Sequence, residues 1–275
     1  MKKAMKGAIM FPLYSQTPYA TYEADLFPSL CTNSTVHFER SLLGESYENN
    51  PIYLYSLGSG TKTILMTAGV HPRESINSFA LLALLNQYRT RMAEPLISSW
   101  FSSHQLLLVP MLNPDGYRRS LIQPDYKHNG RDIDLNRNFP CKLWKEKWFG
   151  DVPASEVETR LLITLFHRKT PDLYLDIHSR GKGIYYYRNT MNERYNKRQK
   201  QLAEKLSAVT GYELYPPEFE INPNDSGGNT VQYFAETFQK PAFTIETVPE
   251  CATFPISMTY LPEVLKELEN LIFLF

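Results

Sequence analysis

Two histidines and two glutamates stand at positions in this sequence where they could perform metal-assisted hydrolysis. His71 and Glu74 are three residues apart, a spacing that lets both side chains face one point from a single turn. His178 follows a different apolar run. Catalytic zinc is commonly held by three ligands of the histidine and carboxylate type, which leave a fourth position for water. These three residues are therefore candidate metal ligands, and Glu246, which ends a further apolar run, is a candidate catalytic carboxylate.

Each of these signals also has an ordinary structural explanation. A histidine and a glutamate at this spacing occur by chance in many proteins and can lie in a solvated surface turn. A single glutamate after an apolar strand is commonly solvated or engaged in a salt bridge. From the residues alone, a zinc site and an unrelated set of polar residues both stay open.

The elements that must position these residues alternate between strands and helices. Short apolar runs bounded by turn residues predict strands, at residues 63–70, 105–111, 172–177, 183–187 and 242–245. Apolar residues at helical spacing predict helices, at residues 75–91, 155–169, 192–209, 230–239 and 262–274. The sequence Ser155-Glu-Val-Glu158 resembles a capping box at the start of the second of these helices.

This alternation predicts an α/β fold, with one domain over residues 1–275 built on a mostly parallel, mixed and twisted sheet with helices on both faces. Ligands of such sheets bind beyond the carboxyl ends of the strands, where the candidate site residues are expected to meet. Residues 1–60 have few periodic stretches and are predicted to be a partly irregular lead-in packed on the domain. Residues 117–150 are predicted to form a long loop, and such loops are commonly functional.

Composition narrows the remaining function classes. The chain of 275 residues has 29 Lys and Arg against 29 Asp and Glu, so its formal net charge gives no case for nucleic acid or a membrane as a partner. Cys31, Cys141 and Cys251 lack metal-ligand spacing and are expected to be free thiols of a reducing compartment. The N-terminal apolar stretch is too short for a signal peptide, and no run is long enough to span a membrane. We expect a cytoplasmic protein, with secretion and oligomeric state left open.

Five motifs, in order along the chain, resemble those of the zinc carboxypeptidase family M14. They are Gly69-Val-His-Pro-Arg-Glu74, Asn113-Pro-Asp-Gly116, Asp134-Leu-Asn-Arg-Asn-Phe-Pro140, Asp176-Ile-His-Ser179 and Thr244-Ile-Glu246. The resemblance implies a zinc carboxypeptidase-like fold, one zinc ion held by His71, Glu74 and His178, and Glu246 as general base and then acid. It also implies a set of substrate-binding residues, namely Asn136, Arg137, Ser179, Asn229 and Thr230.

Within this family, the segments His178–Tyr185, Thr210–Leu214, Ser226–Gly228 and Lys240–Glu246 are most similar to bacterial γ-D-glutamyl-diamino acid endopeptidases and murein peptide amidases. The resemblance implies a small peptide substrate, and the leading candidate is the γ-D-glutamyl–diamino acid bond of cell-wall muropeptides. An ordinary carboxypeptidase, a zinc deacylase of N-acyl amino acids and an inactive peptide-binding module stay as alternatives.

The sequence departs from the family pattern at several positions. Lys127 stands where many members have an arginine that stabilises the oxyanion, and it is assigned that role with Arg118 and Arg131 as alternatives. Pro223 lies near the place of a tyrosine typical of carboxypeptidases. The endopeptidases often have an acidic residue after the two glycines, where this chain has the neutral Asn229 and Thr230, so recognition of a diamino acid stays open. Tyr185-Tyr-Tyr187 could line a substrate wall or could simply pack within the sheet.

Overall fold

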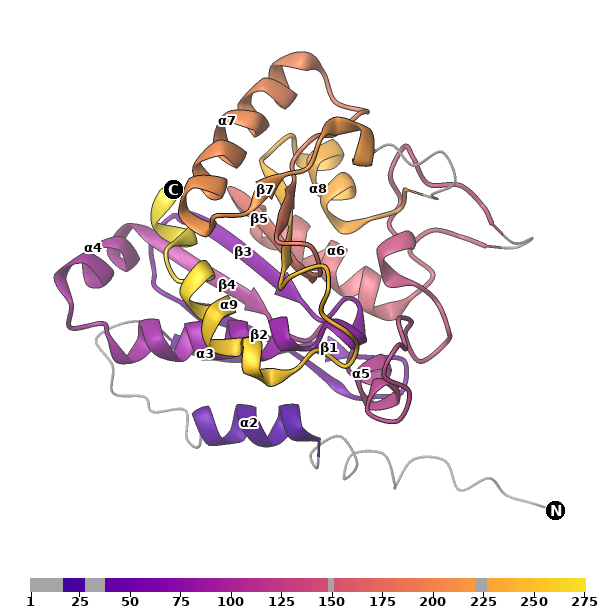
Figure 1. The fold of residues 1–275 in the computed structure, drawn as a ribbon, viewed down its shortest axis with the longest axis horizontal. Helices are drawn as coiled ribbons and strands as arrows, with labels where there is room; N and C mark the ends of the chain where they lie inside the picture. Colours follow the sequence, from indigo (N-terminus) through magenta and orange to yellow (C-terminus); the bar gives the residue numbers. More distant parts are fainter. Residues whose placement is uncertain (1–16, 28–37, 148–150, 221–226) are drawn as a thin grey trace.

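The computed structural model describes residues 17–27, 38–147, 151–220 and 227–275, and Figure 1 shows helices packed around one twisted sheet. Eight strands follow the order β1-β2-β4-β3-β5-β8-β6-β7 across this sheet. Their bounds are β1 Phe38–Glu45, β2 Pro51–Leu57, β3 Lys62–Ala68, β4 His104–Val109, β5 Leu173–Ser179, β6 Gly183–Tyr185, β7 Glu213–Leu214 and β8 Ala242–Thr247.

The centre of the sheet is parallel and the edges are mixed, which confirms the predicted sheet type. β4, β3, β5 and β8 run parallel to one another, whereas β1 and β2 form an antiparallel extension at one edge. At the other edge β6 is antiparallel to β8, and β7 is parallel to β6. All seven residues of β5 are buried, because helices cover both faces of a parallel sheet. The buried polar residues of β5 are Asp176, His178 and Ser179.

Two hydrophobic clusters, one on each face of the sheet, make up the core. The first cluster contains side chains of α2, α3, α4 and α9, and the second contains those of α6 and α8. α7 contributes Leu206 to the first cluster and Tyr195 to the second. The helix bounds are α2 Pro18–Leu26, α3 Ile76–Thr90, α4 Pro95–Ser103, α5 Pro114–Ser120, α6 Val157–Lys169, α7 Glu193–Thr210, α8 Thr230–Phe238 and α9 Leu261–Leu268.

The predicted strands and helices are present with shifted ends, but the first sixty residues differ from the prediction. Residues 38–57, expected to belong to a partly irregular lead-in, form β1, β2 and the turn between them. The exposure pattern of β1 shows why it was missed, since none of its residues is fully buried and it carries no apolar run. Residues 1–16 and Cys31 lie outside the described residues, while Cys141 is buried and Cys251 is exposed, both as free thiols.

The capping box predicted at Ser155 is wrong. α6 begins after Glu156, whose side chain makes no capping hydrogen bond. Ser155 Oγ instead accepts from Asn138 Nδ2 at 2.9 Å, and Glu158 Oε1 accepts from the backbone nitrogen of Tyr47 at 3.3 Å. Both side chains therefore form hydrogen bonds with residues distant in the sequence. A local sequence pattern cannot indicate such partners. No helix in the described parts of the chain has the length and apolar character needed to cross a membrane.

Candidate metal centre and substrate cavity

His71 and Glu74 meet because a tight turn and one short helix follow β3. Gly69 has φ of +68°, and a Cβ atom there would lie 2.8 Å from Ser78 Oγ, so the turn requires glycine. Pro72 begins the 3-10 helix Pro72–Glu74, where its fixed φ is compatible with the first helical position. As a result, His71 Nδ1 lies 3.0 Å from Glu74 Oε1.

His178 reaches the same point from the carboxyl end of β5. Its Nδ1 lies 3.0 Å from Glu74 Oε2, and the backbone nitrogen of Ser179 donates to that oxygen at 3.1 Å. One ligand atom of each of His71, Glu74 and His178 lies within 4.8 Å of the other two, and all three residues are buried. Ligands at zinc distances around a tetrahedral centre are separated by about 3.3 Å. The donor types and their spacing therefore fit one zinc ion.

Carboxylates lie against the outer nitrogen of each histidine. His71 Nε2 is 3.2 Å from Asp134 Oδ1. His178 Nε2 is 3.0 Å from Asp176 Oδ2, although at an angle outside that of a hydrogen bond. Such partners orient the imidazole rings and leave the Nδ1 atoms for a metal. Burial alone would raise the pKa of Glu74, but the two neighbouring histidines together hold it below its usual range.

Replacement of Asp134 by asparagine is expected to weaken zinc binding about 10- to 100-fold, because Asp134 orients His71 from behind. Competition with a chromogenic chelator measures this affinity. Asp172→Asn is the matched control, since Asp172 pairs with Lys240 at 2.9 Å and is not among the residues that line the site. Equal zinc affinity in the Asp134→Asn and Asp172→Asn variants would contradict the orienting role.

Glu246 lies beside the candidate metal ligands because β8 pairs with β5 in a register that sets it opposite His178. Its Oε2 is buried and has no hydrogen-bond partner among the described residues. Burial raises the pKa of Glu246 to about 8; the charge of His178 opposes this shift and that of Glu74 adds to it. A buried carboxylate oxygen without a partner is costly, so this geometry favours a ligand or water at that point.

A cavity of about 440 Å³ opens beside these residues. Four of the five predicted substrate residues line it, namely Asn136, Arg137, Ser179 and Asn229. Asn136 Oδ1 accepts from the backbone nitrogen of Thr230 at 3.2 Å, which fixes the amide against the start of α8. Gly228 comes so close to the backbone of Arg137 that a Cβ atom would lie 2.6 Å from its carbonyl oxygen. Gly228 thus permits close packing onto the Asn136–Arg137 loop, while a Cβ atom at Gly227 would lie 2.3 Å from the Cβ atom of Leu143. Pro223 and Ser226 lie outside the described residues.

Two predicted substrate residues, Thr230 and Ser179, have different surroundings. Thr230 is fully buried, does not line the cavity, and donates its hydroxyl to Asp176. Its position at the first turn of α8 turns the side chain toward Asp176 in the core, and its contact with substrate stays a prediction. Ser179 lines the cavity, but its Oγ accepts from Asn77 Nδ2 at 2.9 Å and is 2.8 Å from Thr247 Oγ1. Its hydroxyl is therefore engaged within the protein.

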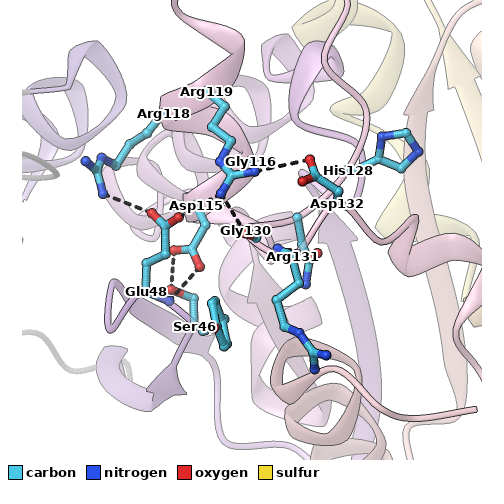
Figure 2. A network of polar contacts seen from close by, with 12 residues as sticks. Ser46, Glu48, Asp115, Gly116, Arg118, Arg119, His128, Gly130, Arg131 and Asp132 are labelled. Atoms are coloured by element: carbon cyan, nitrogen blue, oxygen red, sulfur yellow. Dashed lines mark hydrogen bonds and ion pairs between the residues drawn. The ribbon is translucent and has the colours of Figure 1, made fainter. Parts of the chain in front are cut away.

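Lys127 lies in the cavity, and the arginines considered as its alternatives do not. Lys127 Nζ is 2.8 Å from Asp134 Oδ2. Arg118 pairs with Glu48 at 3.3 Å (Figure 2). Arg131 pairs with Glu156 at 3.4 Å. Neither arginine is among the residues that line the cavity.

The network drawn in Figure 2 holds the loop that carries Lys127. Asp115, which is fully buried, accepts from the backbone nitrogen of Glu48 at 2.8 Å. Glu48 pairs with Arg119 at 3.1 Å, and Arg119 Nη2 donates to the carbonyl of Gly130 at 2.6 Å. The Asn113-Pro-Asp-Gly116 motif therefore connects the β1–β2 turn to the loop around the site.

Sequence reasoning missed several residues of the cavity wall, namely Arg73, Arg180, Phe219, Glu220, Glu250 and Phe254. Arg73 lies inside the metal motif and could have been found there. The guanidinium carbon of Arg73 is 4.5 Å from the centre of the Phe254 ring, and that of Arg180 is 5.6 Å from it. Phe254 comes from a loop after β8 with no local pattern that indicates a site. Tyr185 lines the cavity, as one of the two interpretations of Tyr185-Tyr-Tyr187 predicted.

The structure is an α/β fold with two histidines and a glutamate that could hold a metal at the carboxyl ends of parallel strands. The model of the zinc carboxypeptidase family matches residues 34–269, and the chain belongs to this family. Zinc is the metal that the family implies.

Individual relatives include an endopeptidase and an amidase. The chain is 24% identical over 253 residues to gamma-D-glutamyl-L-diamino acid endopeptidase 1 of Lysinibacillus sphaericus, covering 78% of this chain and 62% of the relative. It is 34% identical over 161 residues to murein peptide amidase A of Escherichia coli, covering 52% of this chain and 58% of the relative. The chain thus spans about three fifths of the length of these relatives. Thrombin activatable fibrinolysis inhibitor has the same fold, with a TM-score of 0.75 at 16% identity over 92% of this chain and 71% of that one.

Proposed function

We propose that the protein is a zinc-dependent peptidase that hydrolyses an amide bond next to a free carboxylate. His71, Glu74 and His178 would hold one zinc ion, which when bound would polarise the scissile carbonyl and lower the pKa of a water molecule. Glu246 Oε2, which is buried in the same cavity without a hydrogen-bond partner in the described parts of the chain, is the observation that carries this proposal. A carboxylate in that place can accept a proton from the attacking water and pass it to the leaving nitrogen.

The remaining cavity residues have roles that follow from their chemistry. Arg137 can form a bidentate pair with the substrate carboxylate, and the amide of Asn136 can donate to the same group. Lys127 brings a positive charge to the cavity and would stabilise the oxyanion as a point donor. Asn229 would contact the residue after the cut.

We further propose the γ-D-glutamyl–diamino acid bond of muropeptides as the substrate bond. Four cationic side chains line the cavity: Arg73, Lys127, Arg137 and Arg180. A conventional peptide offers them one terminal carboxylate, whereas a γ-linked D-glutamate keeps its own α-carboxylate and diaminopimelate adds two more. Similarity to the endopeptidase and the amidase supports the same substrate class.

We expect release of free diaminopimelate from L-Ala-γ-D-Glu-meso-diaminopimelate by the zinc-loaded protein. The matched control is the peptide with an α-linked D-glutamate, which moves the extra carboxylate and should be cleaved at least about 10-fold more slowly. A hippuryl dipeptide and an N-succinyl amino acid test the two alternative activities. Faster cleavage of either alternative substrate would replace the muropeptide assignment, and no turnover of any substrate would favour the binding module.

A further inference from the structure

One acidic side chain of the cavity has no role in the chemistry proposed above. Glu220 ends the short helix Pro217–Glu220 and lines the same cavity as Glu246, with its side chain 10% exposed. Tyr185 and Thr244 line the cavity as well, and they face each other in the register of β6 and β8. Thr244 precedes Glu246 by two residues in β8, so both side chains project from one face of the strand.

A buried arginine fixes the position of this carboxylate. Arg188 is fully buried, and its Nη1 lies 2.5 Å from Glu220 Oε1. The guanidinium also donates to the carbonyl oxygens of Tyr187 at 2.6 Å and Ala242 at 3.0 Å. Because Arg188 is enclosed and engaged in this way, it anchors Glu220 and does not present its own charge to the cavity. Within the described residues, Arg188 is the side chain that pairs with Glu220, through one of its two carboxylate oxygens.

An aromatic wall supports the helix that carries Glu220. The rings of Tyr185 and Tyr215 are 4.4 Å apart between centres, and those of Tyr215 and Phe219 are 5.7 Å apart. Phe219, immediately before Glu220, is 60% exposed. This wall offers apolar surface for a chain of methylene groups, with the carboxylate beside it.

The other groups available to recognise a cation are weaker candidates. Asn229 is neutral, and Thr230 is turned into the core toward Asp176. Glu250 also lines the cavity, but its side chain is 74% exposed and lies 3.5 Å from Arg180. Glu220 is the better enclosed of the two, and enclosure strengthens a charge-assisted contact.

We propose that Glu220 binds the ammonium group of the residue released by cleavage, which selects a long side chain that ends in an amino group. The inference rests on the proposed function and deepens it, because it names the group that distinguishes a diamino acid from other leaving residues. Glu220 thereby takes the place of the acidic residue expected after the two glycines, from a different segment of the chain.

The test compares leaving residues that differ by the amino group. The substrates are L-Ala-γ-D-Glu-X tripeptides in which X is L-lysine, L-norleucine, meso-diaminopimelate or L-2-aminopimelate. Lysine is compared with norleucine, and meso-diaminopimelate with 2-aminopimelate. In each pair we expect kcat/KM to be about 10- to 100-fold higher for the substrate whose side chain carries the amino group. Glu220→Gln should remove this preference, and Glu218→Gln, an exposed neighbour with the same charge change, should keep it. Equal rates within the pairs for the wild-type protein, or a preference that persists in Glu220→Gln, would overturn the proposal.

A second measurement separates this inference from the proposed function. Cleavage rates of hippuryl-lysine and hippuryl-norleucine give the same comparison for conventional peptides. Calorimetry with free L-lysine and L-norleucine measures binding affinity without turnover. A preference for lysine over norleucine that is lost in Glu220→Gln, in a protein that cleaves none of the γ-D-glutamyl peptides, would support the role of Glu220 and reject the muropeptide substrate. Cleavage of the tripeptides at equal rates with and without the amino group would support the muropeptide substrate and reject the role of Glu220. Equal binding of the two free amino acids by a protein that cleaves none of the peptides would overturn the role of Glu220.

Discussion

Glu246→Gln is expected to lower kcat/KM by about 100- to 10,000-fold while the protein keeps its zinc. The amide has the shape of the carboxylate but cannot take a proton from water. Since Glu246 is outside the candidate ligand group, the metal content should not change. Activity on the preferred peptide, together with zinc content measured by atomic emission on the same sample, checks both halves of this prediction.

Glu213→Gln provides the matched control for the loss of one carboxylate. Glu213 is exposed in β7, and the same substitution there should leave activity and zinc content unchanged. Two results would count against Glu246 as the base: substantial activity of Glu246→Gln, or loss of zinc together with loss of activity. The second result would instead make Glu246 a metal ligand.

His178→Ala is expected to weaken zinc binding more than any other single change considered for the centre. It removes one of three candidate ligands and leaves Asp176 buried without the imidazole beside it. A zinc ion that binds only the folded state stabilises it, at about 2.7 kcal/mol when zinc is at 100 times its Kd. The wild-type protein should therefore show a clear rise in Tm on zinc addition, and His178→Ala should show little or none.

The comparison for this variant is His167→Ala. His167 is an exposed residue of α6 whose Nε2 lies 3.1 Å from the hydroxyl of Tyr233, and it has no place in the candidate site. Its zinc-dependent rise in Tm should equal that of the wild-type protein. An undiminished rise in Tm in His178→Ala would show that the metal is held elsewhere.

The candidate centre could be predicted from the sequence because its residues sit on strongly patterned elements. His71 follows the apolar run of β3, while His178 and Glu246 lie near the ends of β5 and β8. Parallel neighbouring strands end at the same edge, so polar residues at those ends must approach one another. The short spacing from His71 to Glu74 completes the group within one turn.

The residues that distinguish one substrate from another were harder to predict. Arg180, Glu220 and Phe254 belong to short irregular segments, and nothing in the local pattern separates them from solvated loop residues. β1 was missed for a related reason, since an edge strand with partly exposed residues has no apolar run to indicate it.

The sequence by itself determined the central parallel strands β3, β4, β5 and β8, most of the long helices, the family and the four candidate residues of the centre, because periodicity and short-range spacing are local properties of the chain. Only the tertiary structure decided which charged side chains face the cavity. Lys127 lies there beside Asp134, whereas Arg118 and Arg131 pair with Glu48 and Glu156. Glu220 is held at the wall by Arg188, 32 residues away. The strength of such ion pairs depends on the distance between the charges and on how deeply they are buried. Residues far apart in the sequence determine both quantities.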